Sequence, residues 1–376
     1  MKKIKVVHVL NSVGGVNVHL RIILKALDPD KITNVVIHGI NDTDQPFLDL
    51  KKEKVPEYKI PIQREISPIK DFISVINTIK ILRKEKPDII HAHSAKGGII
   101  GRFASLGYKC NVLYTPHAFS YLSTSSSLKR KVYLLIEKLF KHFNSILLAC
   151  SNSERQRGIN EVGYRENKAI TINNSIEPIS QDLIKDNIDI KLPEHFICTV
   201  GRPSYQKNIE MMIEVLKILN NKFPDIHLVI MGVGEYSPNE QKVKDLIKKH
   251  NLSNNTTLIP WIEREKIFSI IKKSKLYLST SRFEGLPYSI IEALSLSKSC
   301  VVTNCDGNID LIKNEFNGYV IENYCAETMA NKVSELLNND KLRLSFEKNA
   351  LEYFNKNFNI NNKIKELENI YIANSK

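Results

Sequence analysis

Two glutamates eight residues apart, Glu284 and Glu292, bracket a short turn and the start of a predicted helix. The turn contains Gly285, Leu286 and Pro287, and a proline near the first helical position is typical of a helix start. Backbone N–H groups and the positive end of the helix dipole make such a start a site for phosphate. Carboxylates repel phosphate but accept hydrogen bonds from hydroxyl groups. The pattern indicates a phosphorylated sugar or nucleoside, and the alternative is a helix start with two solvated glutamates.

Two cations occupy a second loop, residues 201–208, which follows a predicted strand at 195–200 and opens a helix. Arg202 offers a planar fork of donors and Lys207 a point charge, and both suit a diphosphate. Taken alone, two cations in a loop usually indicate a solvated turn. Ligands of parallel sheets bind outside the carboxyl ends of the strands, so this loop and the 284–287 turn should share one edge of a sheet.

Three histidines follow predicted strands of the first half. His91 and His93 lie two apart and share a face of a strand, but no third ligand has a suitable spacing, so we expect no metal site. His117 comes just after a buried strand and next to a proline. It could donate a hydrogen bond to a sugar hydroxyl or to a leaving phosphate, and local packing is the alternative.

The elements that must position these residues alternate between strand and helix, which predicts an α/β protein with parallel sheets covered on both faces. Strands are predicted near residues 4–10, 33–39, 56–61, 87–92, 111–115, 145–150 and 168–173, and after a polar connection at 181–193 near 195–200, 226–231, 256–259, 275–280 and 299–303. We therefore expect two doubly wound Rossmann-like domains facing a cleft, at 1–180 and 181–376, with the final helix packing back on the first.

The first strand of each half ends in a glycine loop, at Gly14-Gly15 and at Gly201, which lets a ligand approach the backbone closely. Neither Gly14-Gly15 nor Gly232-Val-Gly234 continues into the G-x-G-x-x-G spacing of a dinucleotide site, which argues against a dehydrogenase.

Charge is distributed unevenly along the 376 residues. Residues 1–180 hold 28 Lys and Arg against 16 Asp and Glu, whereas residues 181–376 hold 26 against 25. An anionic partner is thus expected for the first half only. A basic, apolar stretch at 128–143 could lie on an anionic membrane surface, and a core helix with a basic outer face is the alternative. No nucleic-acid module is present, so nucleic acid is not expected.

Six cysteines without a C-x-x-C pair indicate neither a zinc site nor a disulfide framework, which fits a reduced cytoplasmic compartment.

These motifs together resemble the GT-B-fold glycosyltransferases of family 4, which are retaining and use nucleotide sugars. The resemblance covers nearly the whole chain, through Gly14-Gly15, His91-Ala-His93, Thr-Pro-His117, Asn174, Gly201-Arg202 to Lys207-Asn208, and Glu284-x7-Glu292. The one departure is Ser175, where the family commonly has glycine, and it affects the conformation of the Asn174 loop.

The resemblance implies a role for each matching residue. Arg202 and Lys207 would neutralise the donor diphosphate, with Glu284 on the donor sugar and Glu292 on the ribose. The full set that it implies is His117 and Glu284 as catalytic residues, Gly15, Arg202, Lys207, Trp261, Gly285, Leu286 and Glu292 for the donor, and His91, His93 and Asn174 on the acceptor side. Core packing is the alternative for Trp261.

The resemblance also implies a reaction. It would transfer a sugar, with retention and with neither metal nor cofactor, from a UDP-sugar to a glycan or a polyprenyl-diphosphate-linked sugar in bacterial surface polysaccharide synthesis. The protein would be cytoplasmic, on the inner face of the membrane if peripheral. Asp28-Pro-Asp30 resembles a D-x-D metal motif but falls at the wrong end of the sheet and is interpreted as a turn. A nucleotide-sugar 2-epimerase and a non-catalytic sugar-nucleotide-binding subunit remain alternatives.

Overall fold

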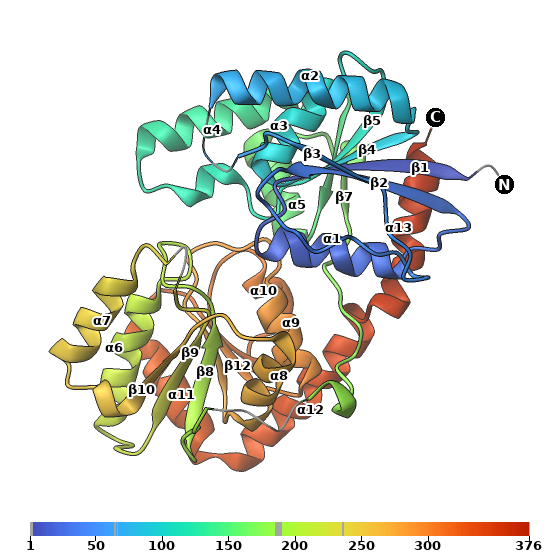
Figure 1. Cartoon of the computed structure of the whole chain (residues 1–376). Coiled ribbons are helices and arrows are strands. Elements are labelled where there is room, and N and C mark those ends of the chain that lie inside the picture. The colour runs from blue at the N-terminus through green and yellow to red at the C-terminus, as the bar shows by residue number, and fades with distance from the viewer. Residues whose placement is uncertain (1–2, 64, 66, 185–189, 235–236, 376) are drawn as a thin grey trace. The chain divides into compact units, whose positions relative to one another are not determined.

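The computed structural model describes residues 3–63, 65, 67–184, 190–234 and 237–375, and the chain forms two compact units (Figure 1). Unit 1 comprises Met1–Asn174 together with Ile360–Lys376, and unit 2 comprises Ser175–Asn359. The division falls after residue 174, whereas the sequence placed it at 180, and the end of the chain belongs to unit 1. The predicted connection at 181–193 lies partly outside the described residues.

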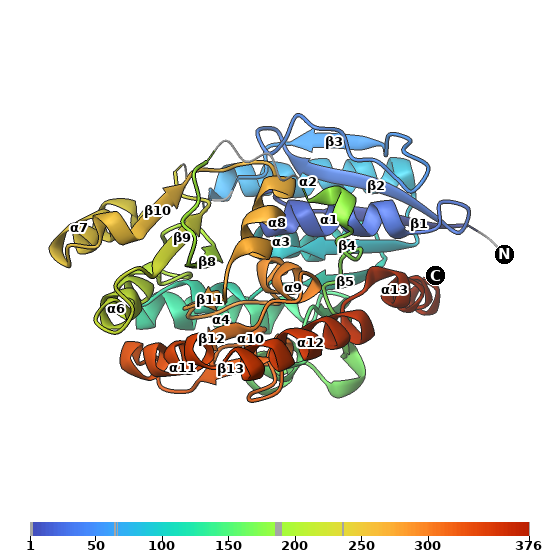
Figure 2. The same cartoon turned by 90° about the horizontal axis from the view of Figure 1, so that it is seen from below.

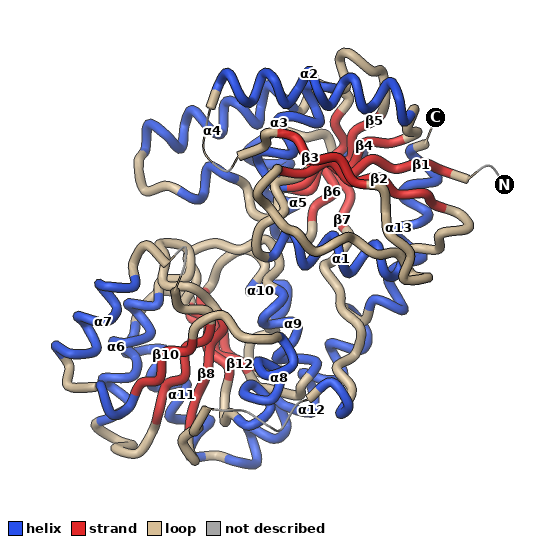
Figure 3. Tube along the Cα trace, in the orientation of Figure 1, coloured by secondary structure: helices blue, strands red, loops and turns tan. Residues whose placement is uncertain are grey.

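Unit 1 is built on a seven-stranded sheet whose paired strands all run parallel, with strand order β3-β2-β1-β4-β5-β6-β7 (Figure 3). The strands are β1 (Ile4–Val9), β2 (Ile32–Gly39), β3 (Glu57–Ile60), β4 (Ile89–His93), β5 (Asn111–Thr115), β6 (Ser145–Ala149) and β7 (Ala169–Thr171). They agree with the seven predicted strands to within two residues at each end. Most of their residues are buried, as expected for a sheet covered on both faces.

Two layers of helices cover this sheet. Side chains of α2 (Pro68–Glu85) and α3 (Ser94–Ala104) share one core with the sheet, while α1 (Gly15–Ala26) and α13 (Ile360–Asn374) share the core of the other face (Figure 1). The helices α4 (Ser127–Phe140) and α5 (Asn152–Arg157) complete the unit. The C-terminal helix α13 is fixed in unit 1 by Tyr371, which is fully buried, and by Glu368, which accepts a hydrogen bond from the Asp28 backbone N–H at 3.0 Å.

Unit 2 is built on a six-stranded parallel sheet of order β10-β9-β8-β11-β12-β13. Its strands are β8 (Phe196–Val200), β9 (His227–Met231), β10 (Thr256–Ile259), β11 (Tyr277–Ser279), β12 (Cys300–Thr303) and β13 (Gly318–Ile321). Five were predicted. The edge strand β13 was missed: it begins with a glycine directly after a polar Asn-Glu-Phe-Asn turn, so its apolar run is only three residues long.

The helices of unit 2 also lie on both sides of its sheet (Figures 1 and 2). They are α6 (Ile209–Asn220), α7 (Glu240–Lys249), α8 (Arg264–Lys273), α9 (Tyr288–Ser295), α10 (Asn308–Leu311), α11 (Ala326–Asn338) and α12 (Asp340–Asn357). The helices α6, α7 and α11 share a core with β8, β9, β11 and β12. No helix in the described part of the chain is long and apolar enough to cross a membrane.

Each sheet has one position where the strand order reverses. In unit 1 the first strand, β1, lies between β2 and β4, and in unit 2 the first strand, β8, lies between β9 and β11. Ligands of doubly wound sheets bind at such reversals, outside the carboxyl ends of the strands. His93 ends β4, Gly15 begins the helix after β1, and the loops after β8 and β11 carry Lys207 and Glu284. The chemistry found in the sequence therefore lies where the fold favours a ligand.

Candidate active site

The carboxylate of Glu284 is buried and held from three directions in unit 2. Lys207 Nζ lies 2.7 Å from Oε1, the Ser281 hydroxyl donates to the same oxygen at 2.7 Å, and Gln206 Nε2 donates to Oε2 at 3.1 Å. The pair that the sequence could only place on one sheet edge is therefore in direct contact. Ser281 and Gln206 were not identified from the sequence, because short polar side chains in loops give no signal of what they bond.

Lys207 reaches Glu284 along a route that requires Gly201. A Cβ built at Gly201 would lie 3.1 Å from Lys207 Cδ, closer than most carbon contacts, so a side chain there would push the lysine stem away. The loop is also tied to β11, because the Thr280 hydroxyl lies 3.1 Å from the Lys207 carbonyl oxygen and Arg282 N–H donates to the Gln206 carbonyl at 2.8 Å. Arg202, the other predicted cation, is partly buried in the same loop.

Glu292 is buried on α9 and forms an ion pair that sequence reasoning missed. Arg264, the first residue of α8, donates from Nε to Glu292 Oε1 at 2.7 Å and also contacts this oxygen through Nη2. Burial raises the pKa of the Glu292 carboxyl and the Arg264 charge opposes that rise. No described residue hydrogen-bonds Oε2, so the ion pair leaves one carboxylate oxygen for a hydroxyl group.

The turn between Glu284 and α9 packs tightly against Gly307. Gly285 and Leu286 are buried, and a Cβ built at Gly307 would lie 2.5 Å from the Gly285 carbonyl oxygen and 3.1 Å from Leu286 Cα. Gly307 also has a φ of +75°, a conformation that favours glycine. The position of the predicted phosphate-binding backbone thus depends on the absence of a side chain at Gly307.

We expect Gly307→Ala to lower kcat/KM by at least about tenfold, because its Cβ must displace the Gly285–Leu286 backbone, and a misplacement of about 1 Å can cost up to about a hundredfold. Kinetics with varied donor concentration would measure it. Gly163→Ala is the matched control: it also has a positive φ, +83°, but its Cβ meets only the flexible end of Lys141. Equal loss of activity in both variants would show that backbone strain alone is responsible.

Trp261 follows β10 and is 60% exposed, so the core-packing alternative for this residue is wrong. It lies in the loop beyond the carboxyl end of an edge strand, where its ring is available to stack on a planar group.

In unit 1, Gly14 precedes α1 and Gly15 is its first residue, at the strand-order reversal. Gly14 has a φ of +59°, and a Cβ at either glycine would meet no heavy atom of the described residues within 4 Å. The backbone at the start of α1 is therefore open to close approach, as the sequence predicted.

Five histidine rings form a single layer between the sheet of unit 1 and its helices α1 and α13. His8 on β1 and His19 on α1 join the three that the sequence singled out, and neighbouring rings in the layer have centroids 3.9 to 5.7 Å apart. His117 alone is not fully buried. Burial lowers the pKa of each ring, to about 4 for His8 and about 3 for His117, so the layer is neutral at pH 7.

The three residues predicted on the acceptor side, His91, His93 and Asn174, are all buried in the structure, and their contact with an acceptor stays a prediction. His91 uses both ring nitrogens inside unit 1: Nε2 lies 2.9 Å from Thr115 Oγ1 and Nδ1 lies 2.7 Å from the Tyr371 hydroxyl. Asn174 hydrogen-bonds His19.

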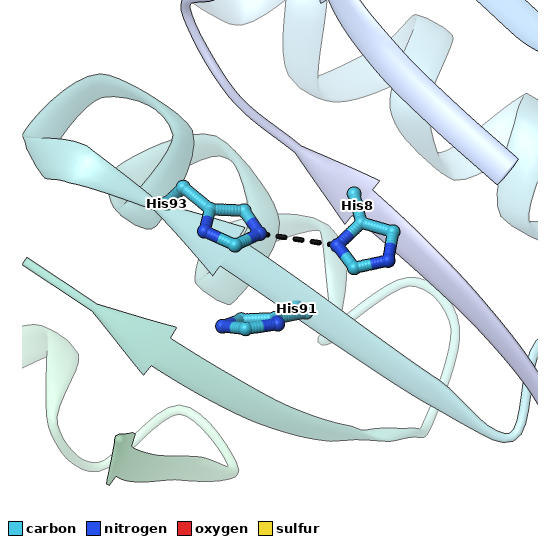
Figure 4. A group of neighbouring side chains, drawn as sticks. All are labelled: His8, His91 and His93. Atoms are coloured by element: carbon cyan, nitrogen blue, oxygen red, sulfur yellow. Dashed lines mark hydrogen bonds between the residues drawn. The ribbon is translucent and has the colours of Figure 1, made fainter. Parts of the chain in front are cut away.

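Sequence spacing gave no third ligand for His91 and His93, but in the structure His8 lies on the adjacent strand in register with His91 (Figure 4). One ring nitrogen of each of the three lies within 4.8 Å of the others, but these nitrogens are engaged in hydrogen bonds. His91 packs over the ring of His93 with centroids 3.9 Å apart, and its nitrogens already have partners. The geometry suits a hydrogen-bonded layer better than a metal centre, whose ligands must converge on one ion.

His117 and Ala118 both have positive φ values, 53° and 77°, and one carboxylate stabilises this unusual turn. Glu154, which is buried at the start of α5, accepts hydrogen bonds from the backbone N–H groups of Ala118 at 2.7 Å and Cys150 at 2.8 Å. Strain of this kind is found at functional sites, where the surrounding structure fixes it. By holding this backbone turn, Glu154 keeps His117 at the edge of the histidine layer.

Comparisons with known proteins agree with this architecture. The chain matches the model of Glycosyltransferase Family 4 over residues 13–178 and the model of Glycosyl transferases group 1 over residues 180–353. It is 31% identical to the Escherichia coli UDP-Gal:alpha-D-GlcNAc-diphosphoundecaprenol alpha-1,3-galactosyltransferase, covering 98% of this chain and 97% of that protein. It is 24% identical to the Staphylococcus aureus capsular polysaccharide biosynthesis glycosyltransferase CapM, covering 90% of each.

Among solved structures, Anabaena HepE in complex with UDP and glucose superposes with a TM-score of 0.81 at 17% identity, covering 98% of this chain and 100% of that one. Two doubly wound, Rossmann-like domains of this kind form the GT-B fold. Since both family models match and a relative shares 31% identity over nearly the full length, the chain belongs to glycosyltransferase family 4.

Proposed function

We propose that this enzyme transfers a sugar from a UDP-sugar, with retention, to a polyprenyl-diphosphate-linked sugar in bacterial surface polysaccharide synthesis. The observation that carries the proposal is the contact between Lys207 and Glu284 beside the start of α9. Lys207 has three N–H donors, and one of them holds Glu284, so two are available for the diphosphate. The full-length likeness to a transferase that acts on a GlcNAc-diphosphoundecaprenol substrate supports the acceptor class.

Each residue then has a role in the reaction. As the bond between C1 of the sugar and the phosphate oxygen breaks, negative charge develops on the diphosphate, and Lys207 and Arg202 stabilise it. The acceptor oxygen bonds to C1 on the same face, and its proton passes to the departing phosphate oxygen. Glu284 accepts hydrogen bonds from hydroxyl groups of the donor sugar, and Glu292 Oε2 accepts one from a hydroxyl group of the ribose. In this scheme the cations do the electrostatic work, and we propose that no divalent ion is required.

The test is transfer itself. The enzyme would be incubated in EDTA with UDP-glucose, UDP-galactose, UDP-GlcNAc or GDP-mannose and a short-chain polyprenyl-diphosphate-GlcNAc, with products read by mass spectrometry and anomeric configuration by NMR. An α-linked product from one UDP-sugar without metal supports the proposal. Epimerised donor without transfer would establish the 2-epimerase, and binding without either reaction would establish the non-catalytic subunit. Activity only after metal is restored would exclude the metal-independent mechanism.

We also propose that unit 1 contacts an anionic membrane surface through α4. Leu128, Val132, Leu135 and Leu139 lie on one stripe of this helix and are 46 to 74% exposed. Exposed cations accompany them at Lys129, Arg130, Lys131 and Lys138. The only buried side chain of α4 is Glu137, held by a 3.0 Å ion pair with Arg102 of α3. Tyr133 and Leu134 of α4 pack against the core of unit 1, while the exposed apolar stripe points outward, which supports the membrane proposal.

A second stripe that the sequence analysis did not identify lies on α2, which packs with α4 against α3. Ile69, Phe72, Ile73 and Ile76 are 38 to 76% exposed there. Apolar side chains interspersed with cations suit the boundary of an anionic bilayer.

We expect the double variant Leu135→Ala and Leu139→Ala to reduce binding to phosphatidylglycerol vesicles by about tenfold, equivalent to about 1.4 kcal/mol. Co-sedimentation with vesicles would measure the change. Leu344→Ala is the matched control, since this leucine is 55% exposed on α12 of unit 2. Wild-type protein that binds neutral vesicles as well as anionic ones, or a control that loses as much binding, would contradict the proposal.

A further inference from the structure

Four side chains form a row of hydrogen bonds, here called the file, which runs from the buried amide of Asn34 through His8 and His93 to the partly exposed ring of His117. His93 Nε2 lies 3.1 Å from His8 Nδ1 (Figure 4). His117 Nε2 lies 3.5 Å from His93 Nδ1, and His8 Nε2 lies 3.1 Å from Asn34 Oδ1. A neutral imidazole has one N–H donor and one acceptor nitrogen. The tautomer of each ring therefore determines the tautomer of the next.

The amide of Asn34, at the buried end of the file, determines which ring nitrogen donates in each hydrogen bond. An amide oxygen can only accept, so His8 must carry its proton on Nε2, and its Nδ1 is then an acceptor. His93 must donate from Nε2 to His8 and accept on Nδ1, and His117 must donate from Nε2 to His93. The N–H of His117 is thereby directed into unit 1, and Nδ1 becomes its acceptor nitrogen, for which no described residue is a partner.

His91 lies in the same layer but outside this file. The Thr115 hydroxyl donates to the Leu148 carbonyl oxygen at 2.8 Å, so it can only accept from His91 Nε2. The Tyr371 hydroxyl then donates to His91 Nδ1. This second set of hydrogen bonds is complete in itself and transmits nothing to His117.

We propose that Asn34, His8 and His93 are positioning residues that fix the tautomer of His117, so that its Nδ1 faces the substrate as a hydrogen-bond acceptor. The sequence analysis treated His117 as a donor, to a hydroxyl or to phosphate. When Nδ1 faces the substrate, the neutral ring accepts a hydrogen bond from a sugar hydroxyl and has no N–H group to donate to phosphate. This assignment of a substrate contact rests on the proposed transferase function, whereas the tautomers themselves do not.

The tautomers can be measured on the donor-free, full-length protein with ¹⁵N-labelled histidine. Two-bond ¹H–¹⁵N correlation spectra distinguish an Nδ1–H from an Nε2–H ring, and His117→Gln would assign the His117 signals. We expect His117 to be almost wholly the Nε2–H tautomer. Asn34→Leu removes the acceptor at the far end, so the file loses its direction and both His117 tautomers should become comparably populated. Asn34→Thr, whose hydroxyl can donate or accept, tests the same point with a smaller change in polarity.

Tyr371→Phe is the matched control. It removes a buried hydrogen bond from the same layer, but from His91 rather than from the file, so the tautomer of His117 should not change. With a transfer assay in hand, Asn34→Leu should halve kcat, because about half of the molecules would present the acceptor nitrogen. Tautomers that shift as expected while kcat does not change would overturn the role of the file in transfer.

Two further results would overturn the file itself. One is an Nδ1–H tautomer of His117 in the wild type, or a ratio that Asn34→Leu and Asn34→Thr both leave unchanged. The other is stoichiometric perturbation of the His8 and His93 signals when Zn²⁺ is added to EDTA-treated protein, because that would make these rings metal ligands. Neither result depends on transfer activity, so a failure here is distinct from a failure of the proposed reaction.

Discussion

Lys207→Met is expected to lower kcat/KM by a factor of about 100 to 1000, equivalent to about 2.7–4 kcal/mol of transition-state stabilisation. The substitution keeps most of the apolar stem that passes over Gly201 but removes the charge that meets Glu284 Oε1 at 2.7 Å. It therefore takes away the cation that would stabilise the departing diphosphate. Steady-state kinetics with the best UDP-sugar would give the loss, and donor-induced thermal stabilisation should disappear in the same variant.

Lys242→Met provides the control for the change in net charge. Lys242 is an exposed lysine of α7 in the same unit, paired with Glu210 at 3.4 Å rather than with Glu284. Its substitution should leave both kcat/KM and donor-induced stabilisation within about twofold of the wild type, because exposed ion pairs contribute little. A Lys207→Met enzyme that keeps a third or more of wild-type activity would show that Lys207 does not act on the diphosphate.

The residues that could be predicted for the donor site are those whose chemistry shows in the sequence at the end of a strand. Lys207 and Glu284 follow two apolar runs, and strands of a parallel sheet bring their carboxyl ends to one edge whatever the details of packing. Arg264 could not be predicted as the partner of Glu292, because the pair joins the first residue of α8 to the middle of α9. Their contact depends on how two helices pack, which no local pattern records.

The histidine layer also contains neighbours that sequence spacing could not predict. The spacing of His91 and His93 identifies two rings on one face of a strand. His8 belongs with them because β1 lies beside β4 with His8 opposite His91, a register that follows from strand order and not from sequence spacing. Tyr371 is more distant still, since the chain returns to unit 1 only in its last helix. The burial of His91, His93 and Asn174 and the partners of His91 likewise depend on this packing and could not be predicted from spacing.

Strand positions were largely predictable because buried parallel strands appear as short apolar runs between helices. The sequence did not predict which exposed faces remain apolar. The outward stripe of α4 follows from how this helix is attached. Glu137 points inward to Arg102, and Tyr133 and Leu134 pack against the core, so that the remaining apolar side chains point outward. A pattern of apolar and basic residues alone is compatible with either orientation.

The free energy of unfolding is expected to fall steeply as the pH is lowered from about 6.5 toward 4. The five rings of the layer are neutral in the folded protein, with pKa values of about 4 for His8 and about 3 for His117 and lowered values for the others. In the unfolded chain they protonate near pH 6.5. The rings therefore make their full contribution to the free energy of unfolding above pH 6.5. This contribution is lost as the pH falls through the pKa of the unfolded chain toward the lower pKa values of the folded protein.

Each ring contributes a slope of about 1.4 kcal/mol per pH unit over that window, so His8 alone accounts for about 3 kcal/mol between pH 6.5 and 4. The other four rings lower the stability in the same direction, and the total loss is a large part of the 5–15 kcal/mol of a typical domain. The raised pKa of Glu292 acts in the opposite direction, but it is a single group. Urea unfolding of the wild type at pH 7.5, 6.5 and 5.5 would measure the slope.

His8→Asn should lower the number of protons taken up on unfolding by about one, because one buried neutral ring is removed. His142→Asn is the control, since this histidine is exposed on the surface and stays in water when the chain unfolds. A wild-type stability that changes by less than about 1 kcal/mol between pH 6.5 and 5.5 would contradict the neutral buried layer. It would require the rings to be protonated in the folded state, and the directed file from Asn34 to His117 would then lose its basis.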